Sequence, residues 1–170
     1  MTTLIPNFFQ FLLSLFSKID FFHLLVKEIS IAYHSELNRK IDMVTEITEG
    51  IRVSVDTEYQ PKYSSPRQFH YVFTYKVTIE NESEHTIQLK SRHWEIKDAA
   101  YSDREIEGDG VVGQQPIIEP GQEHVYVSGC NLKSGLGKMI GTYSMERIID
   151  GKQFDVKIPE FVMVVPDRFN

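Results

Sequence analysis

The sequence has almost no cysteine and no cluster of basic residues. Its single cysteine, Cys130, rules out an intrachain disulfide and is typical of a protein of the reducing cytosol, so we expect a cytoplasmic location. The formal net charge is −6. Nucleic-acid binding usually rests on a basic surface that displaces counterions from phosphates. We therefore expect no nucleic-acid partner.

An apolar run long enough to cross a membrane is also lacking. The uncharged stretch over residues 4–16 is followed closely by Lys18 and Asp20, whereas a transmembrane helix needs about 20 largely apolar residues. The start, Met1-Thr2-Thr3, carries no positive charge, and no small-residue cleavage site follows, so a signal peptide is not indicated. We expect no transmembrane segment.

Residues 1–42 differ in composition from the rest. Their four basic and four acidic groups cancel, so the excess acidity belongs to residues 43–170. We predict an apolar N-terminal extension over 1–42 and one folded domain over 43–170. Two interpretations of the extension remain open: a mis-assigned start upstream of Met43, or an amphipathic helix that packs on the domain or makes peripheral contact with a membrane surface.

Alternation of apolar and polar residues dominates the chain after Met43. From Gln68 to Glu80 every odd position is apolar or aromatic, which predicts a long strand with one buried and one exposed face. Gly151 lies between two further strand-like runs, which is typical of a hairpin. Shorter runs alternate similarly; they cover residues 51–55, 87–96, 125–127, 139–149 and 153–158.

These runs predict about seven strands and no convincing helix after Met43. The phase of Trp94 and Ile96 differs by one residue from that of Ile87 and Leu89, which predicts a bulge near 91–93. Short strands with frequent turns favour an all-β, antiparallel β-sandwich of immunoglobulin or fibronectin type III kind. A buried core position is expected for Trp94.

A glycine motif is the first candidate site. Gly108, Gly110 and Gly113 have the G-x-G-x-x-G spacing of dinucleotide-binding loops. The motif is followed by Gln-Gln-Pro rather than by a helix start, which argues against a Rossmann site. Two alternatives remain open: backbone amides of the three glycines that form an anion-binding nest, or a loop that needs positive φ angles.

Catalytic and metal-binding patterns are missing from the sequence. None of the six histidines has the spacing of a metal site, and Cys130 lies in no nucleophile motif. We therefore expect no catalytic residue, no metal ligand, no cofactor and no enzymatic activity. The second candidate site is a loop rich in aromatic residues and proline, either a protein-contact surface or a rigid loop packed on the sandwich edge; its residues are Tyr59, Pro61, Tyr63 and Pro66.

Several stretches together resemble the ApaG family. They run in one order through nearly all of 43–170 and include SRHW (91–94), GDGVVGQQP (108–116), YVSG (126–129), GTYSM (141–145) and IPEF (158–161). Bacterial members of that family resemble a chain that begins at Met43. The resemblance implies a fibronectin-type-III-like sandwich associated with cobalt resistance and with cobalt and magnesium efflux. Related eukaryotic domains belong to an F-box protein and a DNA-polymerase-interacting protein, which implies protein contact.

From these observations we predict a non-enzymatic protein-interaction module that influences cobalt and magnesium homeostasis through an unknown protein partner. The alternative is a binder of a phosphorylated small molecule or of pyrophosphate through the loop 108–113. In that alternative the backbone amides of Gly108, Gly110 and Gly113 hold the phosphate. We expect a monomer or a weak homodimer.

Overall fold

The computed structural model describes residues 27–28 and 43–166 of the 170-residue chain. Lys27 and Glu28 are helical and exposed. Apart from these two residues, the predictions for the extension over 1–42 lie outside the described part of the chain. No helix among the described residues has the length and apolar character that a membrane span requires.

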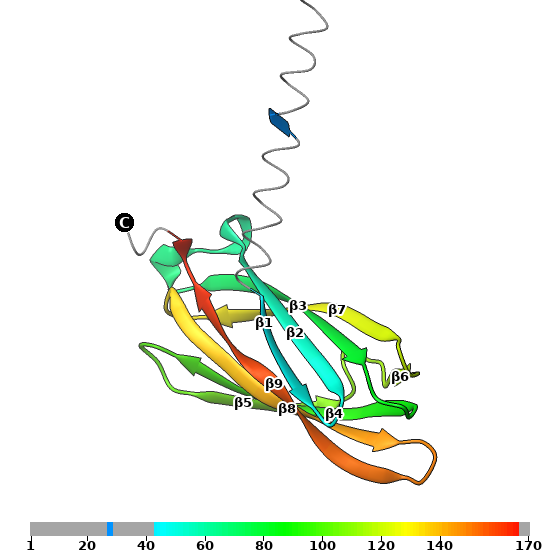
Figure 1. The fold of residues 1–170 in the computed structure, drawn as a ribbon. Helices are drawn as coiled ribbons and strands as arrows, with labels where there is room; N and C mark the ends of the chain where they lie inside the picture. Colours follow the sequence, from blue (N-terminus) through cyan, green and yellow to red (C-terminus); the bar gives the residue numbers. More distant parts are fainter. Residues whose placement is uncertain (1–26, 29–42, 167–170) are drawn as a thin grey trace, which may run out of the picture. The chain divides into compact units, whose positions relative to one another are not determined.

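Two antiparallel sheets account for most of the described chain and confirm the predicted all-β sandwich (Figure 1). The first sheet has the order β1-β2-β3-β7, with bounds Val44–Thr48, Ile51–Tyr59, Tyr71–Asn81 and Glu123–Leu132. The second has the order β5-β4-β8-β9, with bounds Arg104–Asp109, Ile87–Asp98, Leu136–Arg147 and Lys152–Val164. Strand β6, Ile117–Ile118, pairs with β4.

The core lies between the sheets and is built from the apolar side of each alternating strand. Trp94 is 2% exposed, as predicted, and its ring centroid lies 5.8 Å from those of both Tyr75 and Phe161. Gly141 is the partner of Trp94 on β8. A Cβ on Gly141 would lie 2.2 Å from the His93 carbonyl oxygen, so close packing of β8 on β4 requires glycine there.

The long strand predicted from Gln68 begins later than expected. Strand β3 starts at Tyr71, and Phe69 has a left-handed φ of 53° with its side chain 61% exposed. The prediction that Phe69 is a buried strand residue was therefore wrong. The physical reason is local: the chain makes two 3-10 turns, Pro61–Tyr63 and Pro66–Gln68, before it enters the strand.

The predicted bulge in β4 is present, one step earlier than the predicted position. The register between β4 and β8 shifts between Leu89 and Ser91. This shift returns Trp94 to the core face after Leu89, because a one-residue slip exchanges the two faces of a strand. The same shift sets which side chains of β4 face outward in the region described next.

Candidate functional site

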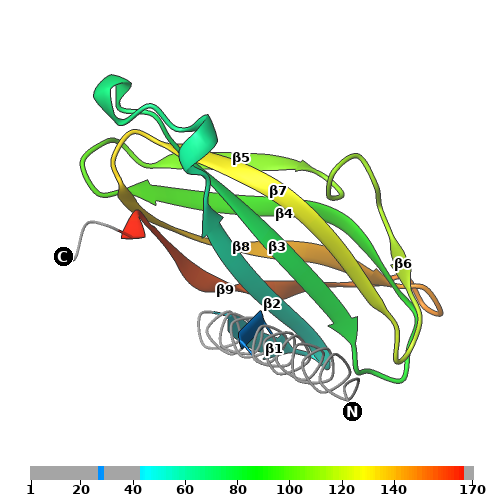
Figure 2. The same ribbon diagram turned by 90° about the horizontal axis from the view of Figure 1, so that it is seen from above.

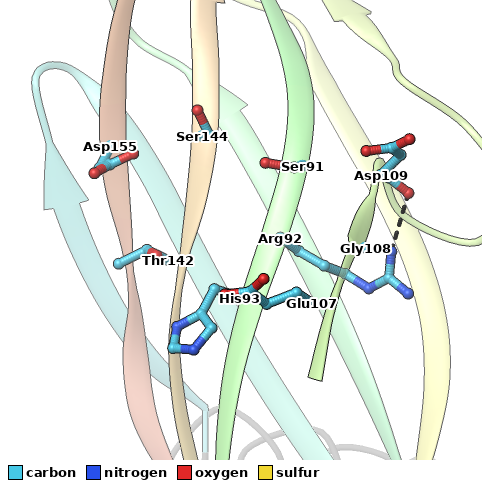
Figure 3. Close-up of a pocket in the computed structure, with 9 residues that line it drawn as sticks. All are labelled: Ser91, Arg92, His93, Glu107, Gly108, Asp109, Thr142, Ser144 and Asp155. Carbon is cyan, nitrogen blue, oxygen red and sulfur yellow. Dashed lines mark hydrogen bonds between the residues drawn. The ribbon is translucent and has the colours of Figure 1, made fainter. Parts of the chain in front are cut away.

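A shallow hollow of about 520 Å³ lies on the outer face of the second sheet. Its side chains come from β5, β4, β8 and β9, which are neighbours in the sheet, and Figure 3 shows them together. Strand register brings the motifs together: Ser91 is the partner of Ser144, and His93 is the partner of Thr142. The SRHW, GDGVVGQQP and GTYSM stretches, far apart in the sequence, therefore meet at one place on β4, β5 and β8.

The hollow is polar, and three carboxylates against the one guanidinium of Arg92 give its lining a net negative charge. Carboxylates of Glu107, Asp109 and Asp155 line it together with the hydroxyl groups of β4 and β8. His93 Nε2 lies 3.8 Å from a carboxylate oxygen of Glu105 at its rim. A second hollow of about 280 Å³ shares His93 and Thr142. Such a surface offers hydrogen-bond acceptors and negative charge, and it repels anions.

Each glycine of the G-x-G-x-x-G motif has a structural reason in this fold. Gly108 lies under the Arg92 side chain, where an added Cβ would lie 3.1 Å from Nη1. Gly110 has a φ of +55°, and a Cβ there would lie 1.9 Å from the Gln114 carbonyl oxygen. Gly113 has a φ of +75° in a tight turn closed by backbone bonds between Val111 and Gln114.

The polar groups of this loop are largely used within the protein. The Gly110 amide donates to the Lys90 carbonyl oxygen at 2.8 Å. Arg92 Nη1 donates to the carbonyl oxygens of Asp109, at 3.0 Å, and of Gly110, at 2.7 Å, and Figure 3 draws the first of these bonds. Gly108 also lines the negatively charged hollow. Anion binding at Gly108, Gly110 and Gly113 stays a prediction, with these contacts against it.

Burial raises the pKa of hydroxyl and thiol groups in the core. The hydroxyl groups of Tyr126 and Tyr143 form a buried hydrogen bond with each other, and burial raises the pKa of both. Burial also raises the pKa of the Cys130 thiol, against the opposing influence of nearby Arg104. Since a thiolate is the reactive form of cysteine, these surroundings favour an inert thiol.

In the described ranges no group of three or more His, Cys, Asp or Glu residues is placed to hold a metal ion.

The predicted interaction loop is the connection between β2 and β3, and Figure 2 shows it projecting from one end of the sandwich. Its predicted residues have different roles. Tyr59 is half-buried and packs on Phe73, with ring centroids 5.3 Å apart. Pro61 and Pro66 begin the two 3-10 turns. Tyr63 is exposed to solvent over 72% of its surface.

Phe69 is also exposed in this loop, although the sequence analysis predicted a buried strand residue. Two backbone hydrogen bonds close the loop beneath Phe69. Ser65 N donates to the His70 carbonyl oxygen at 2.7 Å, and His70 N donates to the Ser65 carbonyl oxygen at 3.2 Å. The Ser64 hydroxyl accepts from the Val72 amide at 2.9 Å. The closed backbone holds Phe69 outward, and two prolines within eight residues of it were the available signal for a turn.

Charge in this region differs from that of the whole chain. No Asp or Glu occurs from 59 to 79, whereas Lys62, Arg67 and Lys76 lie in that stretch. Lys62, Arg67 and His70 are exposed in the loop. The loop over residues 59–70, called the aromatic loop below, is therefore a basic and aromatic projection on an acidic protein.

Comparison with known proteins gives consistent matches. The model of the ApaG domain family matches residues 61–147. The chain is similar to Protein ApaG of Brucella canis, with 44% identity over 126 residues that cover 74% of this chain and 96% of the relative. For Protein ApaG of Anaeromyxobacter dehalogenans the identity is 48% over 128 residues, covering 75% and 100%. A crystal structure of the putative ApaA protein from Bordetella pertussis matches with a TM-score of 0.66 and 44% identity, covering 69% of this chain and 94% of that one.

Proposed function

We propose that this chain, which belongs to the ApaG domain family, is a non-enzymatic protein-interaction module that docks through the aromatic loop. The family match confirms the resemblance carried by SRHW and the neighbouring motifs. The observation that carries the proposed function is the exposure of Tyr63 and Phe69, over 72% and 61% of their surfaces, on a loop closed by backbone hydrogen bonds.

The backbone of the aromatic loop holds Phe69 at an energetic cost. A non-glycine residue in the left-handed region costs about 1–2 kcal/mol, and Phe69 has a φ of 53°. Its exposed ring recovers little of this cost by burial. Strain retained at an exposed aromatic group points to a role outside the folded domain, and aromatic anchors dominate the energetics of many protein interfaces.

Preorganisation supports the same conclusion. The backbone bonds between Ser65 and His70 fix the loop before any partner binds. A partner therefore orders few further residues of this loop, which lowers the entropic cost of association. The exposed Lys62 and Arg67 favour a partner whose contact surface is acidic around an apolar pocket.

Support for a role without catalysis comes from the environment of the single cysteine. Cys130 is buried with a raised pKa, and Arg104 lies 3.8 Å from its sulfur without lowering that pKa below the ordinary value. The outer hollow, which surrounds Gly108 with carboxylates, is also unfavourable for a phosphorylated ligand. We extend the proposal to the cobalt and magnesium homeostasis that the family resemblance implies: the module acts on a transport protein through the aromatic loop.

The proposal is tested by affinity capture from native cells with the tagged full chain and three variants. Tyr63→Ser and Phe69→Gly remove the displayed rings, and glycine at 69 also relieves the left-handed backbone. Ile149→Ser is the matched control, because Ile149 is an apolar side chain 79% exposed in a different loop. Quantitative mass spectrometry should show proteins retained by the wild type and the control and depleted in both loop variants. Equal recovery from all four proteins would contradict docking through this loop.

Thermal shift assays with pyrophosphate, a diadenosine polyphosphate and Co²⁺ address the alternative function. The proposed function predicts no saturable stabilisation by any of the three. A saturable shift with either phosphate compound would replace it with a phosphate-binding role, and Gly108→Ala and Gly113→Ala then test whether the glycine loop is the site. Gly110→Ala is unsuitable for that purpose, because a Cβ at 110 collides with the backbone of Gln114.

A further inference from the structure

The free edges of the two sheets differ in how they are protected. Strand β1 has five residues and lies against β9: the Lys157 amide donates to Thr48 Oγ1 at 3.2 Å, and Lys157 Nζ lies 3.8 Å from a Glu46 oxygen. Strand β5 has six residues, four of them charged. Short length, charge and covering contacts are the usual devices that prevent an edge strand from pairing with another chain.

In the part of the chain that the structure describes, strand β7 has fewer of these devices, and the contact from Arg104 lies at its end, at Asn131. The strand has ten residues, and Glu123 is its only charged one. Its register with β3 runs without a shift from Tyr71 opposite Leu132 to Glu80 opposite Glu123, so no bulge interrupts the edge. It contains no proline. Val125 and Val127 point outward and are exposed over 41% and 59% of their surfaces.

The direction of the free backbone groups of β7 follows from two hydrogen bonds. The Gln122 carbonyl oxygen accepts from the Asn81 amide, next to β3, so even-numbered positions direct their backbone groups toward β3. The Asn131 carbonyl oxygen accepts from Arg104 Nη2 of β5 at 2.5 Å, which places the odd-numbered positions at the free edge. Val125, Val127 and Gly129 therefore direct amide and carbonyl groups outward from the sheet.

This edge is complementary to itself. In an antiparallel pair of two β7 strands with a twofold axis at Val127, the two Val127 residues face each other and Val125 faces Gly129 of the other copy. Apolar side chains then meet on the outer face, and glycine leaves space for Val125. Glu123 lies opposite Asn131, next to Arg104 of the other copy. No two like charges are opposed in this register.

We infer that β7 is the dimerisation edge of this protein, and that two copies pair through β7 with Val127 on the twofold axis. The first sheets of the two copies then form one continuous antiparallel sheet of eight strands. This interface is formed by the edge strand β7 and not by the aromatic loop, so the inference does not depend on the proposed function. The outward backbone groups of β7, unpaired within the sheet, obtain partners from the second copy.

Sedimentation velocity of the full chain from about 1 µM to about 1 mM should show a concentration-dependent monomer–dimer equilibrium. Val127→Lys places two ammonium groups opposite each other and should weaken the dimer about tenfold or more. Val162→Lys is the matched control, because Val162 is a valine of similar exposure, 51%, on β9 of the other sheet. The control should dimerise like the wild type.

A cross-link tests the register independently of affinity. Facing residues of a hydrogen-bonded antiparallel pair have Cα atoms about 5.5 Å apart, within the range that a disulfide spans. Val127→Cys should therefore form a covalent dimer on mild oxidation, while Val162→Cys should not, and Cys130 is buried in both. A wild type that is monomeric at every concentration would overturn the inference. So would a dimer that Val127→Lys leaves intact and Val127→Cys does not cross-link.

Discussion

Replacing Gly110 by alanine should destabilise the domain by about 3 kcal/mol, the sum of two separate costs. Alanine at a left-handed φ costs about 1–2 kcal/mol, and Gly110 has a φ of +55°. The new Cβ would lie 1.9 Å from the Gln114 carbonyl oxygen, a backbone atom that cannot rotate away. Overpacking of this kind typically costs a further 1–3 kcal/mol, on the order of the strain itself.

Urea unfolding followed by fluorescence measures this loss directly. Trp94 is the only tryptophan of the chain and lies in the core, so its emission reports global unfolding. With a denaturant slope of about 2 kcal/mol per molar, a loss of about 3 kcal/mol lowers the midpoint by about 1.5 M. Domains of this size are stable by about 5–15 kcal/mol, so the variant remains folded in buffer.

Two other glycines of the same motif provide matched controls. Gly113 has a φ of +75° with no atom within 4 Å of its built Cβ, so Gly113→Ala should lose only the strain, about 1 kcal/mol. At Gly108 an added Cβ meets a side-chain atom, Arg92 Nη1, at 3.1 Å rather than a backbone atom at 1.9 Å, so Gly108→Ala should lose less than Gly110→Ala. Equal losses for Gly110→Ala and Gly113→Ala would refute the explanation of these glycines by backbone contacts. An anion nest predicts instead that the substitutions alter ligand affinity.

Three further predictions concern buried polar groups. Tyr126→Phe leaves the Tyr143 hydroxyl without its partner and should cost about 1–3 kcal/mol in urea unfolding, while the double Phe variant should cost less than the sum of both single changes. Burial alone would raise the pKa of Asp98, but hydrogen bonds from the Ser134 hydroxyl and nearby amides lower it overall. The resulting stability is present above about pH 4 and is lost as the pH falls through the lowered folded-state pKa, so Asp98→Asn should flatten the acid limb of a stability–pH curve. Cys130 is buried with a raised pKa, so a thiol reagent at pH 8 should label it only after denaturant is added.

Alternation in the sequence was sufficient to predict the sandwich because side-chain direction in a strand has period two. The run from Tyr71 to Ile79 and the buried Trp94 were found in this way. Alternation of apolar and polar residues does not show at which residue pairing with the neighbouring strand begins. For this reason Phe69 was wrongly predicted to be a buried strand residue. Its ring continues the apolar phase, yet the turn begun at Pro66 sets its backbone before strand pairing starts.

The hollow on the second sheet could not be assembled from the sequence, because its geometry depends on pairing between distant strands. Ser91 faces Ser144 only because the bulge after Leu89 shifts the register by one residue. The pattern indicated a bulge but not its partner strand. Gly108 likewise resembled part of a phosphate-binding loop when only the sequence was considered. The structure shows that glycine at 108 leaves space for the side chain of Arg92 on the neighbouring strand.

The net charge of the chain says little about the proposed interaction, because acidic and basic side chains gather on different surfaces of the domain. The carboxylates of Glu107, Asp109 and Asp155 gather on the outer face of the second sheet. The aromatic loop, by contrast, contains Lys62 and Arg67 and no acidic residue. A total of −6 describes neither surface. Because charge acts on a partner over about 8–10 Å at physiological salt, the proposed interaction depends on the local sign of charge at the aromatic loop, and we expect it to favour acidic partners although the chain itself is acidic.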